Sequence, residues 1–353
     1  MNAIPATNGH AGAGGGAGAS TATGAQRETL VRVSNLVKHY DSRRGAWGRL
    51  TGNPGSLVQA VSGVSLDIGR GETVGLIGES GCGKSTLGRA ILRLHEPTSG
   101  RVEFDGVDVT ALPGPQLKAM RRRMQIIFQD PYASLNPRKT VAEIVGLPLK
   151  LHGVARGGEA RERVAAMIEN VGLRTEHLGR YPHEFSGGQR QRIGIARALI
   201  LNPQFLVCDE PVSALDVSIQ AQILHLLGTL RRELGLTYLF VSHDIAVIGY
   251  VSERIAVMYL GEIVEYGPTR LILEQPRHPY TQALLSAIPR VDHAGAHERV
   301  RLQGDLPSPI DPPPGCRFHT RCPQATERCR TEAPRSVRLA DGRTAACHLL
   351  TPA

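Results

Sequence analysis

Short, mostly apolar runs alternate along this chain with longer segments of helical periodicity. The short runs are typical of buried strands and lie at residues 73–77, 124–128, 205–208 and 237–241. The longer segments place apolar residues at three- and four-residue steps, which predicts helices at residues 87–94, 189–200 and 217–234. Strands alternating with helices predict an α/β core.

Other segments depart from this alternation. Further strands are predicted at residues 30–40, 57–68 and 100–105. From residue 140 to about 178 the pattern is helical, with Val164, Met167, Ile168 and Val171 on one face, which predicts a helical insertion between two halves of the core. Residues 1–26 are almost all small or polar and predict a disordered tail. Residues 41–56 predict a surface loop that carries the only tryptophan.

Length and charge narrow the class of protein. The chain has 353 residues, enough for two domains, and 41% of them are hydrophobic. It contains no apolar run near the roughly 20 residues that span a bilayer, and its start lacks a secretion signal, so we expect a cytoplasmic protein. The formal charge is +9, but the arginines are scattered and aromatic residues are only 4%, so we expect no nucleic-acid partner.

A glycine-rich run, G-E-S-G-C-G-K-S-T, stands between a predicted strand and a predicted helix. Glycine allows backbone angles at which successive N–H groups curl around phosphate oxygens at a helix N-terminus. Lys84 adds a positive charge, and the Ser85 hydroxyl suits a phosphate-bound Mg²⁺. The run predicts a nucleoside triphosphate site, and its candidate binding residues are Gly78, Ser80, Gly81, Cys82, Gly83, Lys84, Ser85 and Thr86.

Polar side chains also follow three of the buried strands. Gln129 follows one strand, Asp209 and Glu210 end another, and His243 comes just after a third. Because side chains alternate along a strand, the two acids are expected to face different ways, one toward the metal shell and one toward water. A second anion-binding helix start is predicted at Ser186, Gly187, Gly188 and Gln189.

In this order, the motifs closely resemble those of the ATP-binding subunits of ABC transporters. By that resemblance residues 78–86 correspond to the Walker A loop, residues 186–189 to the signature, residues 205–210 to Walker B and residues 213–216 to the D-loop. Gln129 and His243 correspond to the Q-loop and the switch histidine, and Tyr40 to the adenine-stacking residue. Phe185 stands where many members have leucine. The resemblance covers about residues 28–270 and implies a P-loop NTPase core with an antiparallel β subdomain.

The family's mechanism places ATP between two subunits, so that the signature residues act on the partner's nucleotide. It implies Mg²⁺ ligands Ser85, Gln129 and Asp209. It also implies catalytic roles for a set of four residues, Lys84, Gln129, Glu210 and His243.

A finer resemblance, to the oligopeptide/dipeptide importer branch, is carried by residues 128–137, by H-P-Y-T-Q-A-L-L-S-A-I-P at residues 278–289, and by a cysteine-bearing tail. The insertion before Leu57 is most similar to the F-type ATPase subunit. The branch implies a D-type paralogue as second ATPase, two transmembrane permeases, a periplasmic binding protein acting indirectly, and a place on the cytoplasmic face of the inner membrane. A nickel or other solute importer is the alternative, and a soluble nucleic-acid ATPase a less favoured one.

Four of the six cysteines cluster near the end of the chain, at Cys316, Cys322, Cys329 and Cys347. Clustered thiols in a cytoplasmic protein argue for a metal more than for disulfides. The wide spacing suits an iron–sulfur cluster at least as well as zinc, and the resemblance favours [4Fe–4S]; zinc and bare thiols stay open, with His319 and His348 as substitute ligands. The predicted domains are residues 27–275, with a helical subdomain at about 138–190, and a C-terminal extension at 276–353.

Overall fold

The computed structural model describes residues 27–41, 56–287 and 304–350. The predicted tail at 1–26 and residues 42–55 of the predicted surface loop lie outside these ranges.

The largest element is an eight-stranded sheet whose strand order is β11-β12-β10-β9-β3-β8-β7-β6. The pairs from β9 to β6 are parallel, whereas β10, β12 and β11 extend the sheet antiparallel at the β9 edge. In chain order its strands are β3 (Thr73–Ile77), β6 (Met124–Ile127), β7 (Phe205–Asp209), β8 (Thr237–Val241), β9 (Arg254–Tyr259), β10 (Glu262–Pro268), β11 (Val337–Arg338) and β12 (Thr344–Ala345). The four strands predicted from apolar runs are β3, β6, β7 and β8, next to one another.

A second sheet of four antiparallel strands has the order β2-β1-β4-β5. Its strands are β1 (Thr29–Asp41), β2 (Leu57–Gly69), β4 (Ser99–Phe104) and β5 (Val107–Asp108). Burial alternates in the second half of β2, where the buried Val64, Leu66 and Ile68 alternate with exposed residues, whereas register shifts interrupt the alternation predicted for residues 30–40 in β1.

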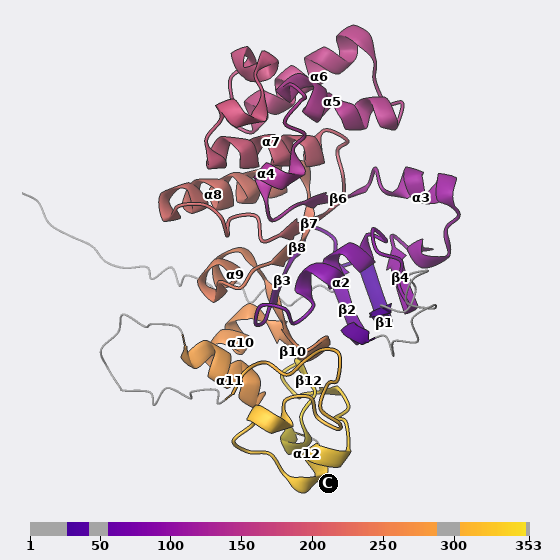
Figure 1. Cartoon of the computed structure of the whole chain (residues 1–353), viewed down its shortest axis with the longest axis vertical. Helices are drawn as coiled ribbons and strands as arrows, with labels where there is room; N and C mark the ends of the chain where they lie inside the picture. The colour runs from indigo at the N-terminus through magenta and orange to yellow at the C-terminus, as the bar shows by residue number, and fades with distance from the viewer. Residues whose placement is uncertain (1–26, 42–55, 288–303, 351–353) are drawn as a thin grey trace, which may run out of the picture.

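Helices cover the large sheet and extend beyond it (Figure 1). Helices α2 (Lys84–Ile91), α7 (Gly187–Leu199) and α9 (Ile245–Val251) contact its strands, and α8 (Val217–Leu234) packs on α7. Helices α5 (Val141–Leu151) and α6 (Gly157–Asn170) pack on α7 at one end of the molecule. The shorter helices are α3 (Gly114–Met120), α4 (Pro131–Ser134), α10 (Thr269–Glu274), α11 (Pro279–Ser286) and α12 (Glu327–Thr331).

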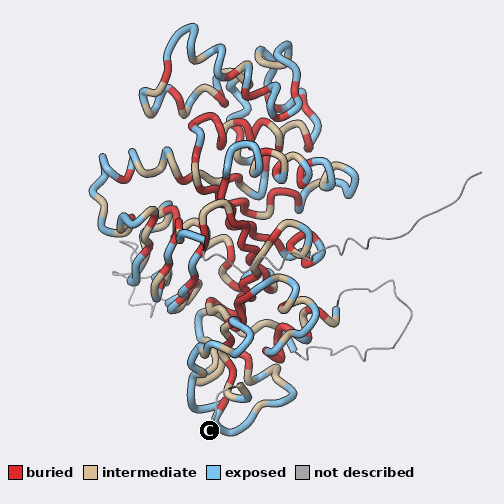
Figure 2. Tube along the Cα trace, turned by 180° about the vertical axis from the view of Figure 1, so that it is seen from behind, coloured by how far each residue is buried: buried red, intermediate tan, exposed pale blue. Residues whose placement is uncertain are grey.

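Two hydrophobic cores lie on opposite faces of the large sheet, because neighbouring strand residues point in opposite directions. In β7, Phe205 and Val207 join the core shared with α2 and the antiparallel sheet, whereas Leu206 and Cys208 join the core beneath α7 and α8. Figure 2 shows this buried material as a continuous band along the middle of the molecule. The predicted strands and helices are thus placed by burial on both faces.

The last described part of the chain is attached to the edge of the large sheet. Strand β12 pairs with β10, with Glu265 opposite Ala345. Beside them the fully buried Arg343 pairs with Glu265 at 3.4 Å and with Asp341 at 2.6 Å, and it donates to the carbonyls of Leu271 and Gln275. A buried guanidinium needs such partners, so these contacts hold residues 304–350 against the core.

Candidate nucleotide site

The glycine-rich run forms a loop between β3 and α2, and two of its glycines are required by close approach. A Cβ at Gly78 would lie 2.1 Å from the Met258 carbonyl oxygen, and one at Gly83 would lie 2.0 Å from that of Ala60. Gly81 has open space around it but a φ of +81°, which side chains disfavour. The loop is therefore pressed against neighbouring backbone and leads into the N-terminus of α2, an arrangement that suits phosphate binding.

The side chains at the start of α2 are linked to the loop and to β7. The buried Lys84 ammonium donates to the carbonyls of Gly78 and Glu79, at 2.7 and 2.9 Å. The Ser85 hydroxyl donates to an Asp209 carboxylate oxygen at 2.7 Å, and Arg89, one helical turn later, pairs with the other oxygen at 3.2 Å. Arg89 was not predicted, although its i+4 spacing from Ser85 places both on one helix face.

The two neighbouring acids face different partners, as predicted, although Glu210 lies just beyond the end of β7 and not in the strand. Asp209 turns toward α2, whereas Glu210, which has a left-handed φ of +46°, accepts a hydrogen bond from the Gln129 amide at 2.9 Å and lies 3.2 Å from His243 Nδ1. Gln129, Glu210 and His243 therefore meet although they come from three loops. Gln129 was expected beside Ser85 and Asp209 as a metal ligand, but its amide contacts Glu210 instead.

The predicted second anion site is the N-terminus of α7. Ser186 accepts a hydrogen bond from the Gln189 N–H, and the Gln189 side chain accepts one from the Ser186 N–H, which forms a capping box. Gly188 packs closely on Ile219 of α8. Within the described ranges, no hydrogen bond joins Ser186 or Gly187 to the phosphate loop. The predicted second anion site is therefore exposed to solvent and separate from the loop.

Tyr40 lies one residue before the end of β1, beside a histidine and a lysine. Its hydroxyl bonds to His95 Nδ1 at 2.5 Å, and the Lys38 ammonium lies 4.8 Å from its ring centroid. Lys38 thus lies over the ring of the tyrosine that was expected to stack on adenine.

The four clustered cysteines gather at one corner of the C-terminal segment. Burial, together with the charges of the other three cysteines, raises the pKa of the Cys316 thiol to about 11. Burial also raises the pKa of Cys322 and of Cys347. None of the four is in a disulfide, and no group of three or more metal-binding side chains in the described ranges is arranged to hold an ion. In the described residues the four cysteines are therefore not arranged around a single metal ion.

The two candidate substitute ligands are engaged with backbone oxygens. His319 Nδ1 lies 2.9 Å from the Cys316 carbonyl oxygen, and His348 Nε2 lies 2.8 Å from that of Glu332.

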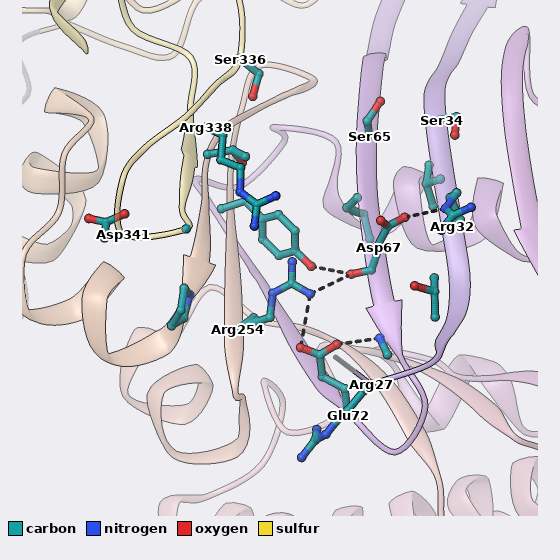
Figure 3. A pocket seen from close by; sticks show the side chains of 18 residues that line it. Arg27, Arg32, Ser34, Ser65, Asp67, Glu72, Arg254, Ser336, Arg338 and Asp341 are labelled. Atoms are coloured by element: carbon teal, nitrogen blue, oxygen red, sulfur yellow. Dashed lines mark hydrogen bonds and ion pairs between the residues drawn. The ribbon is translucent and has the colours of Figure 1, made fainter. Parts of the chain in front are cut away.

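A cavity of about 860 Å³ lies between the antiparallel sheet and the end of the large sheet (Figure 3). Its charged groups largely satisfy one another: Arg254 reaches Glu72 and the Asp67 carbonyl, and Arg32 pairs with Asp67. No residue of the phosphate loop lines it. This cavity is therefore not the nucleotide site; the predicted nucleotide-binding residues lie at the carboxyl ends of β3, β7 and β8.

The loop, the two acids and the histidine at the ends of parallel strands define a P-loop ATPase of the ABC type. The sequence profile described as ABC transporter matches residues 61–213, and that of the oligopeptide/dipeptide transporter C-terminal region matches residues 264–329. The chain belongs to the family of ABC transporter ATP-binding proteins and is an ATPase.

Curated relatives match along nearly their whole length. The oligopeptide transport ATP-binding protein AppF of Bacillus subtilis is 48% identical over 93% of this chain and 99% of its own. The probable peptide ABC transporter ATP-binding protein y4tS of Sinorhizobium fredii is 49% identical over 92% of this chain and 91% of its own.

A solved structure shares the fold. The ATP-binding cassette MJ0796, in a dimeric post-hydrolysis state bound to ADP and Pi, has a TM-score of 0.59 and 34% identity, covering 68% of this chain and 99% of its own. Across the ranges that the structure describes here, no helix is both long and apolar enough to cross a membrane.

Proposed function

We propose that this chain is the ATP-hydrolysing subunit of an importer of dipeptides or oligopeptides. The observation that carries the proposal is that an ABC-type ATPase core and the oligopeptide/dipeptide transporter C-terminal region occur in one chain. The curated relatives named for peptide transport support the cargo class and do not favour the nickel or nucleic-acid alternatives.

Within the site, residues 78–86 would hold the phosphates of ATP. Ser85 and Asp209, already hydrogen-bonded to each other, offer hard oxygen ligands that suit Mg²⁺, and Gln129 would join them by turning away from Glu210. Magnesium would neutralise charge on the phosphates. Glu210 would orient and polarise the attacking water, while His243 contacts the γ-phosphate. Ser186, Gly187, Gly188 and Gln189 would cover ATP bound to the partner ATPase; the similar cassette MJ0796 is dimeric in its structure with ADP and Pi.

The membrane partner would bind the helical end of the molecule. A cavity of about 940 Å³ is lined by residues of α5, α6 and α7 and by Ser134 and Asn136, which follow Gln129 along the chain. Leu147 on its rim is 49% exposed. We place a coupling helix of a transmembrane permease here, so that movements at Gln129 are transmitted to it. Two such permeases, a D-type ATPase paralogue and a periplasmic binding protein would complete the transporter at the cytoplasmic face of the inner membrane.

We also propose that the chain divides into an ATPase domain at 27–275, which includes a helical subdomain at about 138–190, and an extension at 276–353.

We further propose that the extension binds a [4Fe–4S] cluster. The pKa of Cys316 is raised by burial and further by Cys329, Cys347 and Cys322, which indicates that the four sulfurs share one neighbourhood. The wide spacing of the cysteines along the chain suits a multi-iron group at least as well as zinc. Anaerobically purified protein should contain iron and sulfide in equal amounts; zinc alone, or no metal, contradicts this.

Transport is tested with the chain assembled with two candidate permeases, a second ATPase subunit and a peptide-binding protein. We expect peptide-loaded binding protein to stimulate ATP hydrolysis and drive peptide uptake into vesicles, and Lys84→Ala to abolish both because the phosphates lose their cation. Binding protein loaded with Ni²⁺ should have no effect. Stimulation by nickel in place of peptide would refute the cargo class.

A further inference from the structure

Glu79, the second residue of the glycine-rich loop, is held by groups from the far end of the chain. The Arg321 guanidinium makes a two-pronged pair with its carboxylate, at 2.7 and 3.0 Å. The Tyr280 hydroxyl accepts a hydrogen bond from the Glu79 N–H at 3.0 Å. With Lys84 donating to its carbonyl, the N–H, the C=O and the carboxylate of Glu79 all have partners.

Both groups are fixed by the packing around them. Tyr280 is fully buried, and its ring contacts Tyr259 and Phe318 with centroid separations of 4.6 and 5.4 Å. The Arg321 side chain is 7% exposed and lies over the Tyr259 ring, 6.0 Å from its centroid. A bidentate pair between such a restrained arginine and a carboxylate specifies direction as well as charge.

We propose that Arg321 and Tyr280 are positioning residues for the phosphate loop, so that the C-terminal segment sets the affinity for ATP. A carboxylate beside a triphosphate repels it and can compete for Lys84, whose ammonium already reaches the Glu79 backbone. Arg321 neutralises this carboxylate and holds it away from Lys84, while Tyr280 orients the first peptide of the loop. The inference rests on the proposed role of residues 78–86 in binding phosphate.

The test is equilibrium binding of Mg-ATP to the full chain, with kcat and KM measured in the assembled transporter. Arg321→Gln should raise the Kd and KM for ATP about tenfold and leave kcat within about twofold, because the freed carboxylate opposes binding. In a Glu79→Gln background the same substitution should change the Kd by less than about twofold, since no charge is left to neutralise. The Kd of Arg321→Lys should lie between those of the wild type and Arg321→Gln, because lysine keeps the positive charge but cannot form the bidentate pair.

Arg317 provides a matched control. It comes from the same segment and its side chain is 11% exposed, but it pairs with Glu262 at 2.8 Å and with Gln59 at 2.9 Å instead of the loop. Arg317→Gln should leave the Kd for ATP within about twofold. If Arg317→Gln lost as much affinity for ATP as Arg321→Gln, the segment would affect ATP binding only by stabilising the fold, and the proposal would be overturned. ATP binding by Arg321→Gln with the wild-type Kd would also overturn it.

Tyr280→Phe keeps the ring and removes only the hydroxyl, so it tests the proposal even if Arg321→Gln does not fold. It should weaken ATP binding about threefold, the scale of one hydrogen bond; no change would refute the role of Tyr280. Lys84→Ala distinguishes failure of the phosphate-loop assignment from failure of the positioning role of Arg321 and Tyr280. If Lys84→Ala binds ATP normally, the phosphate-loop assignment itself fails, whereas loss in Lys84→Ala with unaltered Arg321 variants overturns the positioning role alone.

Discussion

His278 shows how one buried side chain connects the end of the ATPase core to the C-terminal segment. Its Nδ1 accepts a hydrogen bond from the Tyr280 N–H and so caps α11, while its ring bonds to the Ala346 backbone. The Glu265 carboxylate accepts its backbone N–H at 3.0 Å. Burial lowers the pKa of His278 from 6.5 to about 4, because the interior disfavours the imidazolium form.

This residue makes stability depend on pH. The unfolded chain binds a proton at His278 below pH 6.5, whereas the folded chain binds it only near pH 4. The contribution of His278 to the free energy of unfolding is therefore complete above pH 6.5 and is lost as the pH falls toward 4. The loss from this group should approach roughly 3 kcal/mol in the free energy of unfolding. Denaturant titrations across this range should show it in the wild type and not in His278→Asn, which can still cap α11. Parallel pH profiles of the two proteins would contradict the assignment.

At the scale of elements, the sequence predicts those parts whose burial depends on their own pattern. Strand β8 and helix α8 occur at the predicted residues, since a strand buried on both faces reads as an apolar run and an amphipathic helix as a 3.6-residue period. The predicted helical stretch from 140 divides into α5 and α6, with a left-handed Gly153 between them.

Elements that depend on distant partners are not predictable in this way. Strands β11 and β12 have two residues each and exist because β12 pairs with β10. Likewise the motifs predict that Glu210 and His243 lie near the nucleotide, but no local pattern links Arg321 to Glu79, 242 positions away. The negative charge of Glu79 is the feature of the sequence that could have predicted this pair, because a carboxylate in a phosphate-binding loop is stabilised by a nearby cation.

At the scale of the whole molecule, the two predicted phosphate-binding ends are separate. The loop at 78–86 meets Asp209, and Glu210 meets Gln129 and His243. The Ser186 end of α7 is exposed, and in the described ranges the hydrogen bonds of Ser186 are made with residues of α7. Two phosphate-binding ends that do not meet in the described part of the chain are consistent with the proposed sandwich, in which a second ATPase chain completes each site.

The assembly is tested by combining one substitution in each half-site. Glu210→Gln should bind ATP but hydrolyse it at least about 100-fold more slowly, because the water loses its base, and ATP should then hold the ATPase pair closed. In that background Ser186→Arg should block nucleotide-dependent pairing, whereas Ser336→Arg, at an exposed serine outside α7, should not. Light scattering of the two ATPase chains mixed with Mg-ATP measures the pairing. Hydrolysis at the full rate by a strict monomer, unaffected by Ser186→Arg, would show that one chain suffices and would disprove the sandwich.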